Sequence, residues 1–327
     1  MGLSEFALIE RFFSRCGRLR TDVALGVGDD GALLDCPQDM QLAVTTDVLV
    51  EGVHFFPGCP PEALGHKALA VNLSDLAAMG AEPAWATLVL TLPAAEPQWL
   101  DGFASALCDL AAAFGVALVG GDTVHGPRSV SLHLSGFVPR GQALRRRGAR
   151  PGDRLYVTGT LGDAAMALAV RKREVVPPPP EQRAGLDRRL DRPAPRVEAG
   201  IALRGVATAA IDISDGLLAD LGHLLAASGG LGARIERATI PLSPPLRDYT
   251  ERTCDWRFPL AGGDDYELCF AVPPSREQAL VERAALFNCS FDRIGEVEAK
   301  EGIRLVDEAG GLLPLPDGGY DHFAPHG

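Results

Sequence analysis

Four apolar runs of the chain carry aspartates, and these acids constrain the fold more than any other feature. The runs are GVGDD, LAVTTD, LVGGD and AIDISD, and their acids are Asp29, Asp30, Asp47, Asp122, Asp212 and Asp215. A carboxylate taken out of water needs a cation or hydrogen-bond donors. Around the last run, no lysine or arginine occurs between Ala207 and Gly232. We therefore expect each run to be a strand that delivers acids at its end, although any one acid alone also fits a turn or a helix cap.

The alternation of strand-like and helix-like segments predicts a mixed α/β (α+β) fold in two domains. Apolar runs such as LAVTTDVLV, WATLVLTL and VSLHLSGFVP read as strands, and residues 61–79 and 98–114 read as helices between them. A basic, turn-rich segment at 139–153 interrupts this pattern, and a second alternating series follows it. At 327 residues, two domains are also the natural size. We place them at 1–142 and 143–327, the second with a mixed sheet flanked by helices.

Composition excludes some partners and favours a cytoplasmic protein. The net charge of −12 disfavours nucleic acid, and only three basic residues are lysines, so direct contacts with phosphate would come from arginine. No apolar run is long enough to span a bilayer, and the start MGLSEFALIERFF lacks the basic region of a secretion signal. The seven cysteines are odd in number and scattered. They favour reduced, mostly buried thiols over a disulfide framework or a zinc site.

A proline-rich, highly charged segment separates two parts of the predicted second domain. Residues 171–196 read RKREVVPPPPEQRAGLDRRLDRPAPR. Four consecutive prolines and dense charge favour a polyproline II conformation in solvent. We expect an exposed connector and assign no role to Pro177–Pro180.

The sequence GVGDDG at 26–31 matches the dinucleotide-binding pattern G-x-G-x-x-G but lacks its context. That pattern requires a helix whose N-terminus receives a pyrophosphate. Here the following residues, ALLDCP, read as a strand, and Asp29 and Asp30 stand where the anion would rest. We reject the dinucleotide interpretation.

A set of oxygen ligands for several Mg²⁺ ions explains the acids together. Asp75 adds a further acid, in the apolar helix KALAVNLSDLAAMGA. Hard divalent cations take carboxylate, hydroxyl and substrate phosphate oxygens as ligands. The chain has no G-x-x-x-x-G-K-[ST] loop, no protein-kinase motif set and no nucleophile motif such as G-x-S-x-G. Phosphate handling therefore rests on metals and arginine, while the lone His54, between Val53 and Phe55, reads as structural on its own.

Nine segments, in order along nearly the whole chain, resemble the thiamine-monophosphate kinase family. That family belongs to a superfamily with aminoimidazole-ribonucleotide synthetase and selenophosphate synthetase. The segments are GVGDDGALL, TTDVLVEGVHF, KALAVNLSDLAAMGAEPAW, LVGGDT, RRRGARPGDRLYVTGTLGDAA, RPAPRVEAG, AIDISDGLLADLGH, AGGDDYELCF and GGYDHF. The resemblance implies transfer of the ATP γ-phosphoryl group to thiamine monophosphate, which gives thiamine diphosphate. It also implies a homodimer in which the N-terminal domains complete a β-barrel, while the C-terminal domain completes the active site.

The resemblance also implies roles for individual residues. The implied Mg²⁺ ligands are Asp30, Thr45, Thr46, Asp47, Asp75, Asp122, Asp212 and Asp215. Gly121, Asp122, Arg146 and Ser214 are implied contacts to ATP, with Asp47, Asp122 and Arg146 central to catalysis, and His54, Asp264 and Tyr320 are implied contacts to the acceptor. Arg145 and Arg147 flank Arg146, so the sequence leaves open which guanidinium meets phosphate. Asp264 stands where the family often has Glu, which shortens its reach.

Two other functions fit part of the pattern. One is another ATP-dependent enzyme of the same superfamily, such as selenophosphate synthetase, for which RCGR offers Cys16 but no lysine follows for fifty residues. The other is a catalytically silent nucleotide-binding scaffold, which loss of the acids would indicate. None of the expected acids is lost.

Overall fold

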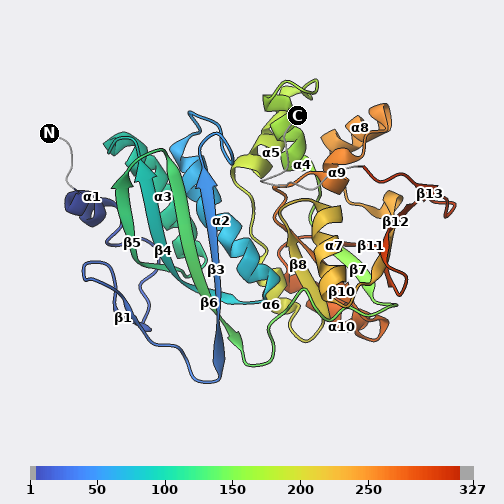
Figure 1. Cartoon of the computed structure of the whole chain (residues 1–327), viewed down its shortest axis with the longest axis horizontal. Coiled ribbons are helices and arrows are strands. Elements are labelled where there is room, and N and C mark those ends of the chain that lie inside the picture. The colour runs from blue at the N-terminus through green and yellow to red at the C-terminus, as the bar shows by residue number, and fades with distance from the viewer. Residues whose placement is uncertain (1–4, 317–327) are drawn as a thin grey trace. The chain divides into compact units, whose positions relative to one another are not determined.

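The computed structural model describes residues 5–316 and divides the chain into two compact units. The first consists of Met1–Leu76 with Ala81–Gly141, and the second of Ala77–Gly80 with Gln142–Gly327. Each unit is built around its own sheet (Figure 1). No helix among the described residues has a stretch long and apolar enough to cross a bilayer.

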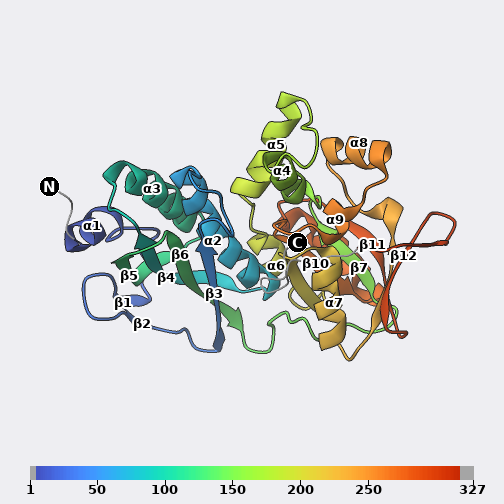
Figure 2. The same cartoon turned by 45° about the horizontal axis from the view of Figure 1, so that its top comes forward.

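The first unit contains a four-stranded mixed sheet with two long helices on one face. The strand order is β3-β6-β4-β5, and only the β4–β5 pair is parallel. Both views show α2 and α3 on the same side of this sheet (Figures 1 and 2). The elements of the unit are α1 (Glu5–Phe12), β1 (Val23–Leu25), β2 (Leu33–Leu34), β3 (Met40–Val50), α2 (Pro61–Ala78), β4 (Glu82–Leu92), α3 (Pro97–Ala113), β5 (Ala117–His125) and β6 (Ser129–Pro139).

The opposite face of this sheet is only partly covered. A small core of Trp85, Val119 and Phe137, joined by Val23 and Leu34 of the β1–β2 hairpin, covers one part of it. The rest carries apolar side chains that are 41–51% exposed, namely Leu42, Val44, Val48, Val89 and Val124. The expected strands and helices of this half are present, and β2 confirms that a strand rather than a helix follows GVGDDG. Within one chain the sheet stays open, with β3 and β5 as its edge strands.

The second unit contains a seven-stranded mixed sheet with packed elements on both faces. Its order is β13-β12-β9-β11-β7-β10-β8. On one face, Leu155 and Val157 of β7 join a large core with helices α4, α7 and α9, while Tyr156 and Phe270 stack on the other. The elements are β7 (Arg154–Thr158), α4 (Asp163–Arg171), α5 (Pro180–Asp191), α6 (Val197–Ala202), β8 (Ala209–Ile213), α7 (Leu217–Ala227), β9 (Gly232–Glu236), α8 (Pro244–Thr253), α9 (Arg257–Ala261), β10 (Glu267–Val272), α10 (Glu277–Arg283), β11 (Phe291–Glu298), β12 (Gly302–Val306) and β13 (Leu312–Leu313), with single 3₁₀ turns at Arg237–Thr239, Pro274–Arg276 and Ala284–Leu286.

The expectation of an exposed connector at 171–196 was wrong from Pro180 onward, whereas residues 172–179 form no helix or strand and are mostly exposed. After the prolines, Pro180 begins helix α5, because proline suits the first turn of a helix, where its missing N–H costs nothing. Leu186 and Leu190 of this helix are buried in the main core of the unit. The composition concealed this packing because two buried leucines are few among so many charges.

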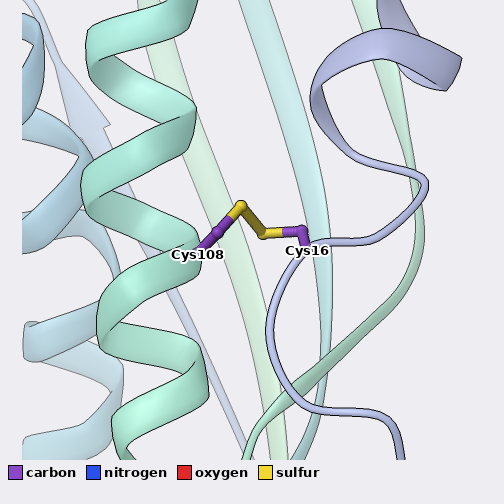
Figure 3. Close-up of a disulfide and its surroundings, with 2 residues drawn as sticks. All are labelled: Cys16 and Cys108. Atoms are coloured by element: carbon purple, nitrogen blue, oxygen red, sulfur yellow. A yellow bond between two sulfur atoms is a disulfide. The ribbon is translucent and has the colours of Figure 1, made fainter.

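The expectation of reduced cysteines without a disulfide was also wrong. Cys16 and Cys108 form a disulfide, with Cα atoms 4.8 Å apart (Figure 3). The segment around Cys16 runs beside β5, where the Leu118 N–H donates to the Cys16 carbonyl and the Arg18 N–H donates to the Val116 carbonyl. This pairing brings Cys16 against α3, which carries Cys108. The two residues are 92 positions apart, so their spacing gave no sign of the contact.

Candidate functional site

The helix-covered face of the first sheet brings together Thr45, Asp47 and Asp75. Thr45 and Asp47 point to the same face of β3 because side chains alternate along a strand. Asp75 lies on α2, which packs on this face, and the Thr45 hydroxyl donates a short hydrogen bond to Asp75 Oδ2. Partial burial, followed by the neighbouring charge of Asp75, raises the pKa of Asp47 to about 7. Asp47 Oδ2 is buried and has no hydrogen-bond partner. The two carboxylates line this site with oxygen atoms, which are the ligands that a hard cation prefers.

Thr46 and Asp122 lie on the other, open face of the same sheet. Thr46 is paired with His133, and its hydroxyl lies 2.7 Å from His133 Nδ1. Asp122 lies on β5, the opposite edge strand, where it is paired with Val89 of β4. Since neighbouring strands are about 4.8 Å apart, three strand spacings put Asp122 roughly 14 Å across the sheet from Asp47 of β3. Thus Asp47 and Asp122 of one chain do not share an ion.

Neither of these two acids ends its strand. β3 continues from Asp47 to Val50, and β5 continues from Asp122 to His125. The expectation that acids follow the strands was therefore wrong for these positions. The glycines of LVGGD let β5 pass very close to β4: a Cβ on Gly121, whose φ is 150°, would stand 1.9 Å from the Leu88 carbonyl oxygen.

Asp30 and His54 occupy separate turns of the first unit. Asp30 is exposed between β1 and β2, and its N–H donates to Asp29 Oδ1. His54 follows β3, and its Nδ1 accepts the N–H of Val50 at 3.0 Å. The neutral His54 ring therefore carries its proton on Nε2. Among residues 5–316, no three His, Cys, Asp or Glu side chains cluster tightly enough to hold a metal ion.

In the second unit, Asp212, Ser214 and Asp215 lie at the junction of β8 and α7. Asp212 is a buried residue of the strand, and Ser214 and Asp215 form the turn that follows. The N–H groups of Ser214, Asp215 and Gly216 all donate to Asp220 Oδ2, at 3.0–3.1 Å. Asp220, in the first turn of α7, thus fixes the turn between β8 and α7. Burial raises the pKa of Asp220 to about 7 in spite of these bonds.

A second turn, Gly262–Tyr266, is bonded directly to this junction. The N–H of Asp264 donates to the Ser214 carbonyl, and the N–H of Tyr266 donates to the Ile213 carbonyl, both at 2.8 Å. A Cβ on Gly263 would come 2.4 Å from the Ser214 oxygen, so only glycine allows this approach. The predicted acceptor contact Asp264 is therefore held beside the predicted metal and ATP contacts of Ser214 and Asp215.

Buried charges fix the other side of the Gly262–Tyr266 turn. Asp265 is 2% exposed and accepts the Gly162 N–H, and burial raises its pKa well above the ordinary value. Glu267 is fully buried and accepts hydrogen bonds from Thr158, Arg189 and Arg196. Sequence reasoning missed Asp220, Asp265 and Glu267 as supports of the site. The signal that could have found them is the position of these acids in ISDGLLAD and GGDDYE, two segments that contain no lysine or arginine.

The Arg145–Arg147 run is anchored by its backbone, and its three side chains are exposed. The Arg145 carbonyl accepts the Ala210 N–H, and the Arg146 carbonyl accepts the Ser228 hydroxyl. The structure therefore fixes the path of this segment beside β8 without singling out one guanidinium. The predicted contact Tyr320 lies outside the described residues.

Family models match both halves of the chain. The N-terminal domain of AIR synthase related proteins matches residues 28–138, and the C-terminal domain of the same group matches residues 150–308. The thiamine-monophosphate kinase of Escherichia coli is 48% identical over 325 residues, which cover 99% of each chain.

Solved structures agree with these matches. The thiamine-monophosphate kinase of Stenotrophomonas maltophilia is 44% identical, with a TM-score of 0.84 over 93% of this chain and 97% of that one. The structure of AaThiL complexed with AMPPCP and TMP is 32% identical, with a TM-score of 0.75 over 99% of both chains. These full-length likenesses also confirm the mixed α/β fold expected from the sequence. The chain belongs to the thiamine-monophosphate kinase family, within the AIR synthase related proteins.

Proposed function

We propose that this protein phosphorylates thiamine monophosphate with ATP and releases thiamine diphosphate and ADP. The observation that carries the proposal is the full-length likeness to AaThiL, whose structure holds AMPPCP and TMP. The acids, the glycine and the histidine that the resemblance implied lie here in strands β3, β5 and β8, in helix α2 and in turns that adjoin them. ATP and thiamine monophosphate are then its small-molecule partners, and the cytoplasm, where ATP is made, is its proposed location.

The chemistry of the acceptor removes the need for a catalytic base. A phosphate monoester has its second pKa near 6 and is mostly dianionic at neutral pH, so it is already an oxyanion nucleophile. The difficulty is the approach of two polyanions, since two unit charges 4 Å apart repel by about 4 kcal/mol at an effective dielectric of 20. Cationic groups and positioned donors must offset this repulsion. His54, with its proton on Nε2, suits a donor to the acceptor rather than a base.

Magnesium fits the oxygen ligands of both units. In the first unit, the unpartnered Asp47 Oδ2 beside Asp75 is the observation that supports a cation there. Thr45, Asp47 and Asp75 would hold an ion in this unit, and Asp212 and Asp215 would do so in the second. Bound Mg²⁺ would neutralise phosphate charge and hold the reacting phosphates in line. The chain's own part is to hold these carboxylates in place, and a bound cation would offset the burial that disfavours the ionised form of Asp47.

We also propose a homodimer in which two copies join their four-stranded sheets. The open face of each sheet exposes Leu42, Val44, Val48, Val89 and Val124. Its edge strands are β3 and β5, and β5 is paired only at its start, with the segment around Cys16. Edges and apolar faces of this kind are sites of association. Pairing β3 of one copy with β5 of the next closes a barrel and buries both features. It also places β3, with Thr46 on the open face and Asp47 next to it in the chain, beside Asp122 of the partner subunit, so that one site would draw on both subunits.

Product identification tests the proposal. The protein is incubated with ATP, MgCl₂ and either thiamine monophosphate, thiamine or aminoimidazole-type ribonucleotide precursors, and products are separated by chromatography. We expect thiamine diphosphate and ADP in equal amounts from thiamine monophosphate alone. Turnover of another acceptor in its place would point to a different enzyme of the superfamily, and ATP binding without any product would point to a silent scaffold.

A further inference from the structure

The acceptor-binding acid of this chain is held by an aromatic neighbour. Tyr266 lies two residues after Asp264, and its phenol donates a hydrogen bond to Asp264 Oδ1 at 2.9 Å. Both side chains are half-buried. A hydrogen bond to a carboxylate is among the stronger side-chain interactions, and it restricts the rotation of the acid.

The backbone of this turn is unusual for residues with side chains. Asp264 has φ of 69° and Tyr266 has φ of 51°, both in the left-handed region. Such conformations cost of order 1 kcal/mol or more for residues other than glycine, and they persist where the surroundings hold them. Here the N–H groups of both residues donate to Ser214 and Ile213. The two left-handed residues place the phenol and the carboxylate within reach of each other.

We propose that Tyr266 is a positioning residue for the acceptor, which acts by orienting Asp264 toward the cationic part of thiamine monophosphate. This inference rests on the proposed function. A donor that selects one rotamer of the Asp264 carboxylate favours binding, because less conformational entropy is lost when the acceptor binds.

A double-mutant cycle separates positioning from packing. The variants are Tyr266→Phe, Asp264→Ala and the double variant, and the readouts are kcat, KM for each substrate and the affinity for thiamine monophosphate by titration calorimetry with a non-hydrolysable ATP analogue. Phenylalanine keeps the ring and removes only the hydroxyl. We expect Tyr266→Phe to raise KM and Kd for thiamine monophosphate about three- to tenfold, in keeping with the net worth of one ordinary hydrogen bond, and to leave KM for ATP unchanged. In the Asp264→Ala background, Tyr266→Phe should have no further effect.

A second phenol–carboxylate pair of this unit gives a matched control. The Tyr249 hydroxyl donates to Asp255 Oδ2 at 2.8 Å. Tyr249→Phe should change thermal stability at most and leave both KM values at the level of the natural protein. Equal effects of Tyr266→Phe with and without Asp264 would overturn the positioning role while the proposed function stands. If the natural protein forms no thiamine diphosphate, the proposed function and the role of Tyr266 both fail.

Discussion

Replacing Asp47 by asparagine should stabilise the metal-free protein at alkaline pH while destroying its activity. The folded-state pKa of about 7 lies above the ordinary value of 3.8, because burial and the charge of Asp75 disfavour the ionised carboxylate. The folded protein therefore binds more protons than the unfolded chain between these two values. By linkage, this acid lowers the free energy of unfolding as pH rises from 3.8 to 7, and its penalty is complete above pH 7.

The size of this penalty follows from the shift. Each pKa unit corresponds to about 1.4 kcal/mol, so three units set an upper bound of about 4 kcal/mol. Asp47 is half-buried, and water at its exposed side reduces the penalty to about 2 kcal/mol. For a unit of this size, 2 kcal/mol corresponds to a rise in Tm on the order of 6 °C. Asparagine keeps the shape of the side chain and removes the charge.

The assay is thermal unfolding of the natural protein and Asp47→Asn in EDTA at pH 5 and pH 8, repeated with MgCl₂. We expect Asp47→Asn to unfold several degrees higher than the natural protein at pH 8 in EDTA, by a smaller margin at pH 5, and to lose this advantage in Mg²⁺. Asp22→Asn is the control of opposite sign, because Arg20 lowers the pKa of Asp22. That carboxylate adds stability above its unfolded pKa, so its removal should lower Tm at pH 8. A lower Tm for Asp47→Asn at pH 8 in EDTA would refute the reasoning.

Three further predictions concern the dimer, the disulfide and the close strand contact. Mixing inactive Asp47→Asn with inactive Asp122→Asn should restore up to half of the natural activity per mixed dimer, because one of the two sites in such a dimer then has both acids. No recovery of activity after subunit exchange would contradict sites that draw on both subunits. Reduction of the Cys16–Cys108 disulfide should lower the free energy of unfolding by about 2–4 kcal/mol, as expected for a crosslink that closes a long loop. Non-reducing peptide mapping first confirms the crosslink, and an unchanged Tm in dithiothreitol would then contradict this value. Gly121→Ala should cost more than 2 kcal/mol, since its Cβ would meet the Leu88 carbonyl, and denaturant unfolding that matches the natural protein would show that β4 and β5 separate easily.

The sequence predicted the elements of the fold well because its apolar periodicity is strong. WATLVLTL and VSLHLSGFVP became β4 and β6, and the helix expected at 61–79 became α2. What it could not show was where an acid lies within a strand. Asp47 and Asp122 looked like strand ends because glycines or hydroxyl residues precede them, but pairing with β6 and β4 continues each strand past its acid.

Contacts between distant segments were the other limit. Glu267 accepts hydrogen bonds from Arg189 and Arg196, which lie more than seventy residues away, within the proline-rich segment that suggested an exposed connector. Cys16 meets Cys108 only because the segment before β1 runs beside β5. The local charge and spacing of residues do not predict contacts between segments so far apart in the sequence. The hydrogen bond between Asp264 and Tyr266 is local, since both residues lie within GGDDY. It nevertheless depends on the left-handed backbone conformation of both residues, which the sequence did not predict.

Transfer of a labelled phosphoryl group tests the central claim most directly. The protein is incubated with MgCl₂, thiamine monophosphate and ATP labelled in the γ-phosphate, and the products are separated and counted. We expect the label in the terminal phosphate of thiamine diphosphate, with one ADP for each molecule formed and no product in excess EDTA. Label released only as inorganic phosphate, with thiamine monophosphate left unchanged, would contradict the account.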